Sequence, residues 1–203
     1  MASLMSGLYP SQHGAVSART PLAKDVTTLA ERFQAAGYQT AAFTGGAFVG
    51  PAHRLDQGFD HFDPTVERAF PAFRVYHPLL WRLAKSRFLP LPFVVRTVGE
   101  YRGLGGAFDA LQAWPIEEER PFLLFVHSYQ VHDYYLYDPR TDDAVRQERK
   151  QPERFAKRMS IHPSELQDAT QEELDWFRAI YDARLSDLER SLEAIIALSL
   201  IHI

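Results

Sequence analysis

The chain has 203 residues, 46% hydrophobic and 13% aromatic, which is enough apolar material to bury one core and excludes a disordered chain. Its 22 basic and 26 acidic residues leave a formal charge of -4, so no overall field gathers nucleic acid or an anionic membrane. Without cysteine there is no disulfide, no thiolate metal site and no cysteine nucleophile in this sequence. The longest apolar run, at 121–126, is far below the roughly 20 residues that span a bilayer. The sequence does not indicate a compartment or an oligomeric state.

Two helices and a strand are predicted in the first 44 residues. Residues 1–14 read as the end of a helix that Gly7 closes, followed by a turn at 9–11. A second helix is expected from Thr28, because Thr28 and Glu31 have the spacing of a capping box and Gly37 can end the helix. Residues 39–44 then read as a short strand that leads into a glycine loop. This order of helix, strand and loop is typical of layered α/β proteins.

The stretch 64–105 differs from its surroundings. It is rich in proline and aromatic residues, holds seven basic residues against two acidic ones, and shows no clear period. Because long irregular segments in compact domains are usually functional loops, we interpret it as an insertion or lid of short helices. A partly ordered surface excursion is the alternative. Trp81, Phe88 and Phe93 are candidates for a pocket lining, although such residues more often pack in a core.

The second half predicts a strand between two helices. A short helix is expected near 106–114, and the apolar run 121–126, which does not alternate, fits a central strand covered on both faces. After a polar connector, Thr170 and Glu173 form another capping box. Helical spacing then relates Leu174, Phe177, Tyr181, Leu185, Leu188, Leu192 and Ile195. This spacing predicts a long amphipathic helix packed on the sheet.

The strongest local signal for chemistry follows the predicted strand. His127, His132 and Asp133 lie where open α/β sheets bring functional groups together. Two histidines and an acid can bind a metal, move protons or donate to an anion, whereas solvated loop histidines are the alternative interpretation. A zinc site is disfavoured because the HExxH pattern is absent.

A small acidic turn holds Asp56, Gly58 and Asp60. It lacks the distal glutamate of a calcium loop, so we interpret it as a solvated turn rather than a metal site.

Three segments, taken in order, resemble the sulfatase family. They are Ala2-Ser-Leu-Met-Ser-Gly-Leu-Tyr-Pro10 with His13-Gly14, then residues 29–40, then 121–132. The helix around Tyr181-Asp182-Ala183 is similar to the one before the family's second metal-binding segment. The resemblance implies an α/β/α sandwich of the alkaline phosphatase type, with a mostly parallel sheet and flanking helices. Residues 1–203 would form part of a single catalytic domain.

The resemblance also implies a reaction and site residues. Sulfatases hydrolyse sulfate esters with a formylglycine nucleophile and a divalent cation, usually calcium, so a small-molecule or glycan sulfate ester is the expected substrate. His132 matches the histidine that contacts the sulfate or the leaving oxygen, and it is the predicted catalytic residue. His127 is a predicted substrate-binding residue. Arg54, or a basic residue of the 64–105 insertion, is expected to help bind the anion.

This sequence departs from the family pattern at several positions. The CxPSR-like nucleophile motif would immediately precede Ala2, and the metal ligands would lie beyond both ends, so we expect neither catalysis nor calcium binding by this chain. Gly45 and Phe48 occupy the places of a sulfate-binding lysine and histidine. The alternatives are therefore a phosphonate or phosphate monoester hydrolase, a phosphoglycerol-type transferase of the same superfamily, or a non-catalytic binding module.

Overall fold

The computed structural model describes residues 1–17, 19–45, 48–64, 103–117, 119–132, 138–154 and 167–201. Almost all of the predicted insertion or lid at 64–105 lies outside the described residues, together with Asp133 and the aromatic residues Trp81, Phe88 and Phe93.

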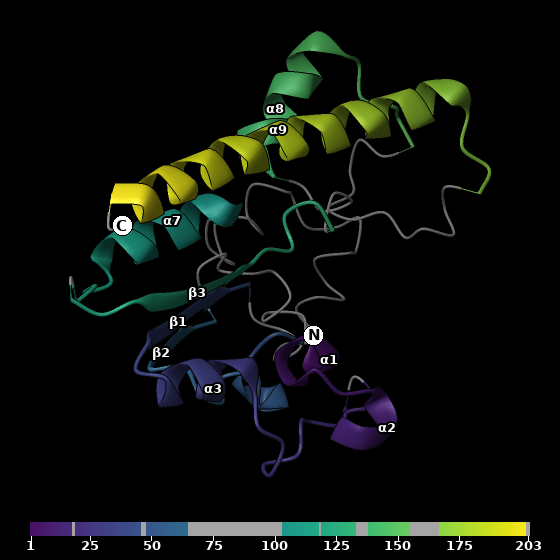
Figure 1. Cartoon of the computed structure of the whole chain (residues 1–203). Coiled ribbons are helices and arrows are strands. Elements are labelled where there is room, and N and C mark those ends of the chain that lie inside the picture. Colours follow the sequence, from purple (N-terminus) through teal and green to yellow (C-terminus); the bar gives the residue numbers. More distant parts are fainter. Residues whose placement is uncertain are drawn as a thin grey trace.

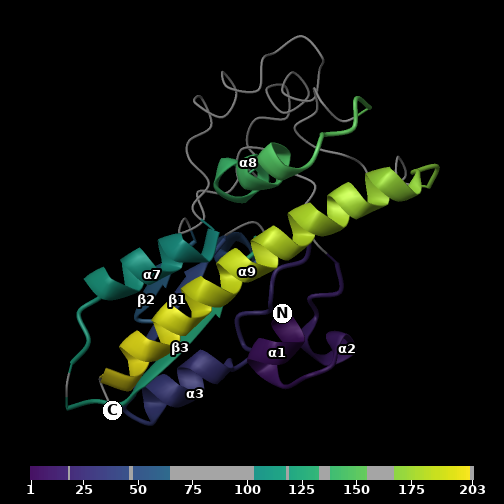
Figure 2. The same ribbon diagram turned by 90° about the horizontal axis from the view of Figure 1, so that it is seen from above.

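The described elements form three layers around a small parallel sheet. In chain order they are α1 (Ala2–Ser6), α2 (Pro10–His13), α3 (Leu29–Ala35), β1 (Gln39–Thr44), the 3-10 turn η1 (Pro51–His53), β2 (His61–Asp63), α7 (Gly103–Ala113), β3 (Phe122–His127), α8 (Pro139–Glu148) and α9 (Gln171–Ile201). The strand order is β2-β1-β3, with both pairings parallel. Helix α3 covers one face of the sheet and α7 and α9 cover the other, whereas α8 lies against α9 (Figures 1 and 2). This arrangement confirms the predicted α/β class. Among the described helices, none is long and apolar enough to cross a membrane.

The predicted helix ends are confirmed by their hydrogen bonds. Gly7 closes α1 with a φ of 70°, a conformation that glycine adopts without steric cost. At the start of α3, the Thr28 hydroxyl accepts from the Glu31 amide at 3.2 Å, and the Glu31 carboxylate accepts from the Thr28 amide at 2.7 Å. Thr170 and Glu173 form the same pair of bonds at the start of α9. The predicted turn at 9–11 is instead the start of α2, a single helical turn.

The prediction that residues 121–126 form a central strand is wrong for the described sheet. There β1 lies in the middle, and all six of its residues are buried, whereas those of β3 are half-buried. The small side chains of Ala41 and Ala42 let helices approach β1 closely on both faces. An unbroken apolar run is equally compatible with either strand position, because both are covered by helices.

Successive side chains of a strand point to opposite faces of the sheet, so the core is divided between the two faces. Ala41 and Phe43 of β1 belong to one buried cluster with residues of α7 and α9, and Leu124 of β3 packs against it. Phe125 points to the opposite face, where it packs on a cluster of Met5, Val49 and Leu55. This second cluster brings α1 against the segments that follow β1 and β3.

Helix α9 is as long as predicted, but its buried stripe is different. Phe177 and Ile195 are buried as expected, whereas Tyr181, Leu185 and Leu192 are exposed. The N-terminal half of α9 packs on α8 through Val145, Trp176, Phe177 and Ile180. Its C-terminal half packs on α7 and the sheet. Because two partners lie at different angles around the helix axis, no single helical face is buried along its whole length.

Helix α8 was not predicted, although its first residues carry a start signal. Asp138 precedes Pro139, and the Asp138 carboxylate accepts from the Arg140 amide at 3.0 Å. The remainder of α8 is so polar that it has almost no apolar period, and Val145 is its buried hydrophobic residue.

Candidate functional site

The carboxyl ends of β1 and β3 meet at one edge of the sheet. Thr44 lies opposite His127 in the parallel register, and the Gly45 amide donates to the His127 carbonyl at 3.2 Å. Parallel strands release their following loops at the same edge, so the loop that holds Arg54 and the loop that holds His132 both start here.

Three aromatic rings form a row along the loop after β3. The His127 and Tyr129 rings lie edge to face with centroids 4.7 Å apart, and the Tyr129 and His132 centroids are 5.9 Å apart. Tyr129 packs against the cluster that contains Met5 of α1, whereas His132 is exposed. The row thus runs from the half-buried end of the strand to solvent, and it lies beside the first helix.

His127 has an unusual environment for a histidine. Burial lowers its pKa, and the positive charges of the chain's amino terminus and of His132 lower the pKa further, while a hydrogen bond to its own backbone opposes them. Its Nδ1 atom is buried without a partner on another described residue. The ring is therefore neutral at pH 7, so it can contribute a hydrogen bond to a substrate but not a fixed positive charge.

The Arg54 guanidinium is engaged by the backbone of another segment. It ends η1 in the left-handed conformation with a φ of 54°, and its Nη1 donates to the Leu22 carbonyl at 3.0 Å. Within the described ranges, no hydrogen bond or ring contact joins Arg54 to His127 or His132. The structure thus brings His127 and His132 into one row with Tyr129, and places Arg54 elsewhere on the loop after β1. Its substrate-binding role stays a prediction.

The two positions that depart from the family pattern lie in that same loop. The Gly45 amide is bonded to the His127 carbonyl, so this position adjoins the end of β3. Phe48 is 50% exposed and lies edge to face with His53 at 5.6 Å. Neither residue offers a charged donor.

Ser3 and His13 form a close pair that the sequence analysis did not single out. The His13 Nδ1 atom accepts from the Ala15 amide at 3.1 Å, so the proton of the neutral ring is on Nε2, which lies 2.9 Å from the Ser3 hydroxyl. His13 therefore donates to Ser3. A nucleophilic serine needs the opposite polarity, so this part-buried pair joins α1 to α2 and does not activate Ser3.

The acidic turn at 56–60 exposes Asp60 to solvent, as predicted, and the Asp60 carboxylate is also hydrogen-bonded to neighbouring elements. The Asp60 carboxylate accepts from Gln34 Nε2 at 2.6 Å and from the amide and hydroxyl of Thr40 at 3.0 and 3.2 Å. Burial pushes the pKa of Asp60 upward, but these hydrogen bonds and the charge of Arg120 outweigh it and hold the pKa below its usual value. Its oxygens are thus engaged in joining β2 to β1 and α3.

The described residues do not fit a divalent cation. In this part of the chain, no three side chains of His, Cys, Asp or Glu lie together as metal ligands. The arrangement can supply a solvent-facing imidazole, a neutral partly buried imidazole and a tyrosine ring at the edge of a parallel sheet.

Tyr129 and Gln130 are the residues of this loop that the sequence analysis missed. Tyr129 links the two histidine rings, and Gln130 is fully buried by contacts with α7 and α9. The only feature of the sequence that pointed to these two residues is that they follow an apolar strand. The partners of Gln130 are 26 and 57 positions away.

Comparison with known proteins identifies the family of this chain. No curated protein matches the chain. The family model described as Sulfatase matches residues 1–191, which include all three segments of the resemblance and the loop that carries His132. Members of this family act on sulfate esters and generally bind a divalent cation. The chain belongs to the sulfatase family.

Proposed function

We propose that this chain supplies the leaving-group side of a sulfate ester hydrolysis site, with His132 as the donor to the leaving oxygen. The observation that carries the proposal is the row formed by His127, Tyr129 and His132 at the carboxyl edge of the parallel sheet. His132 is exposed at the end of this row, and among the described residues its ring touches only Tyr129.

The chemistry assigns a different task to each histidine. When the bond between sulfur and the ester oxygen breaks, negative charge develops on the leaving oxygen, and a protonated or donor imidazole at His132 would transfer or share a proton there. The neutral His127 ring would accept or donate one hydrogen bond beside the bound anion. This division follows from the difference in exposure between the two rings.

We propose further that the chain does not turn over sulfate esters by itself. The 203 residues include no cysteine and no CxPSR-like segment, so they do not supply a formylglycine nucleophile. The described residues also do not supply a calcium site, so no catalytic step is assigned to a cation here. In this proposal, residues 1–203 form part of one sulfatase catalytic domain.

Anion titration by NMR tests the assignment of the site without requiring turnover. Sulfate is expected to shift the His132 ring resonances saturably, and His132→Gln should abolish the saturable response of the neighbouring loop amides. The matched control is His61→Gln, which changes an exposed histidine on β2 in the same way and should leave the response unchanged. Equal shifts at His61 and His132 would contradict the proposal.

Turnover is measured separately with p-nitrophenyl sulfate, with and without calcium. We expect none from the wild-type chain. Hydrolysis that His132→Gln abolishes would disprove the proposed inactivity while supporting the role of His132.

A second function, hydrolysis of phosphate or phosphonate monoesters, is favoured by Gly45 and Phe48. The neutral loop beside His127 lacks the lysine and histidine that the resemblance associates with sulfate. The same titration with phosphate and methylphosphonate decides between the two functions. Sulfate should bind at least as tightly as either anion in the first case, and the order should reverse in the second.

A further inference from the structure

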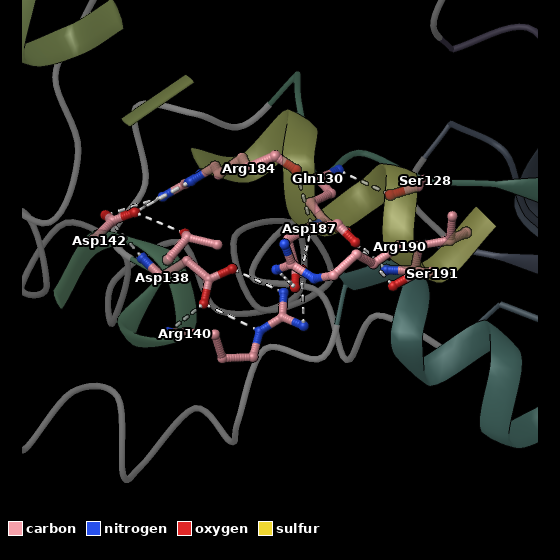
Figure 3. Close-up of polar contacts among 11 residues, drawn as sticks. Ser128, Gln130, Asp138, Arg140, Asp142, Arg184, Asp187, Arg190 and Ser191 are labelled. Atoms are coloured by element: carbon pink, nitrogen blue, oxygen red, sulfur yellow. Dashed lines mark hydrogen bonds and ion pairs between the residues drawn. The ribbon is translucent and has the colours of Figure 1, made fainter. Parts of the chain in front are cut away.

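The loop after β3 is joined to two helices by one buried side chain. Gln130 is fully buried, and its Oε1 accepts from the Leu104 amide of α7 at 2.9 Å. Its Nε2 donates to Asp187 Oδ2 at 2.6 Å and to the Arg184 carbonyl at 3.4 Å, both on α9 (Figure 3). Gln130 therefore satisfies all the hydrogen-bonding groups of its amide except one lone pair, and its position relative to both helices is fixed.

Asp187 also contacts the other end of this loop. Its Oδ2 atom lies 3.4 Å from Arg140 Nη1, and Arg140 pairs with Asp138 at 2.9 Å (Figure 3). Asp187 Oδ2 thus contacts both Gln130, two positions before His132, and Arg140, eight positions after it. The remaining oxygen, Oδ1, lies 3.2 Å from the exposed Arg190.

The backbone at Gly103 shows that this junction is closely packed. Gly103 has a φ of 52°, and a Cβ atom built there would collide with Gln130 Oε1 and lie 2.6 Å from Arg140 Nη2. The side chains from the two ends of the loop therefore occupy the same space above one glycine. This contact is independent of the hydrogen bonds to Asp187.

A second ion pair fixes the helix that carries Arg140. Arg184, one turn before Asp187 on α9, binds Asp142 of α8 through Nη2 at 3.0 and 3.1 Å. Both side chains are buried. Helix α8 therefore cannot shift along α9 without breaking a charge pair, and the far end of the loop is held with it.

We propose that Asp187 is a positioning residue that closes the loop between Gln130 and Arg140 and so determines where the His132 imidazole lies. The catalytic meaning of this position rests on the proposed function, whereas the geometric role does not. Fixing Gln130 limits the positions that His132, two residues later, can adopt, and a catalytic group displaced by about 1 Å can lose about 100-fold in rate.

The test compares Asp187→Ala, Asp187→Asn and the control Asp175→Ala. Asp175 lies on the same helix in an exposed pair with Arg178, so its replacement matches the chemical change without touching the loop. The expected result for Asp187→Ala is a move of the His132 ring resonances and a fall of the Val131 and His132 amide order parameters from about 0.85 to below about 0.6. Asp187→Asn, which keeps an acceptor but loses the charge, should give a smaller change.

A purely structural role predicts a different outcome. In that case the melting temperature falls, but the His132 resonances and order parameters stay as in the wild type, and this result would overturn the proposal. Should Asp187→Ala not fold, Arg140→Gln takes its place, because the Arg140 side chain is 26% exposed; this replacement removes the contact with Asp187 and also the pair with Asp138. Unchanged His132 signals in that variant would equally overturn the proposal.

The measurement separates this inference from the proposed function. If the loop becomes mobile in Asp187→Ala but sulfate does not bind near His132 in the wild type, the positioning role stands and the proposed function is wrong. If sulfate binds at His132 and Asp187→Ala changes neither the loop nor the affinity, the function stands and the positioning role is wrong. Where both hold, the sulfate affinity of Asp187→Ala should fall by at least about threefold.

Discussion

The buried ion pair between α8 and α9 allows a stability prediction worked from its geometry. Arg184 binds Asp142 through Nη2 at 3.0 and 3.1 Å and through Nε at 3.3 Å. The Asp142 carboxylate also accepts from the Asp138 amide and the Thr141 hydroxyl, both at 3.1 Å. The perturbation is Asp142→Asn, which keeps the shape of the side chain and removes its charge.

The expected loss is large because Arg184 has only 1% of its side chain exposed. Removing one partner of a buried ion pair typically costs about 3–5 kcal/mol, a substantial part of the roughly 5–15 kcal/mol that stabilises a domain. Burial raises the pKa of Asp142, against the opposing effect of Arg184, which shows the same cost of holding charge in this place. The exposed pair of Asp175 and Arg178 should contribute below about 1 kcal/mol.

The assay is urea unfolding followed by tryptophan fluorescence, to which Trp176, packed between α8 and α9, contributes. Asp142→Asn should lower the free energy of unfolding by about 3 kcal/mol, and the control Asp175→Asn by less than about 1 kcal/mol. Replacing both partners with apolar residues, Asp142→Leu with Arg184→Met, should return the stability to within about 1–2 kcal/mol of the wild type. Equal losses of unfolding free energy in Asp142→Asn and Asp175→Asn would contradict the claim that the buried pair contributes more than the exposed pair.

Two further predictions concern the helix N-caps and the dependence of stability on pH. Thr28→Ala should cost about 2 kcal/mol and Thr170→Ala about 1 kcal/mol in the same assay, because Thr28 also donates to the Gln57 carbonyl at 2.9 Å whereas Thr170 is an exposed cap; equal losses would contradict this difference. The folded pKa of Asp60 lies below its unfolded value of about 3.9, so its stabilisation is complete above about pH 4 and is lost as the pH falls through the folded pKa. Asp60→Asn should therefore reduce the fall in the free energy of unfolding at acid pH. Asp56→Asn should leave this pH dependence unchanged.

Features that depend on neighbouring residues could be predicted from the sequence. The end of α1 at Gly7, the start of α3 at Thr28 and the strand at 39–44 were all predicted within a residue or two. These features follow from hydrogen bonds and backbone angles within about four positions of each other, which the local sequence specifies. The order of three such segments also identified the family and placed His127 and His132 after a strand.

Features that depend on contacts between distant segments could not be predicted from the sequence. The central position of β1 depends on its pairing with β2 and β3 on either side, and the helix at 139–148 depends on Asp142 meeting Arg184, which is 42 positions away. Burial of Gln130 needs both α7 and α9, and the Arg54 guanidinium donates to the Leu22 carbonyl, 32 positions away. A polar side chain has the same local pattern whether it is solvated or buried, because its partners alone determine which state is stable.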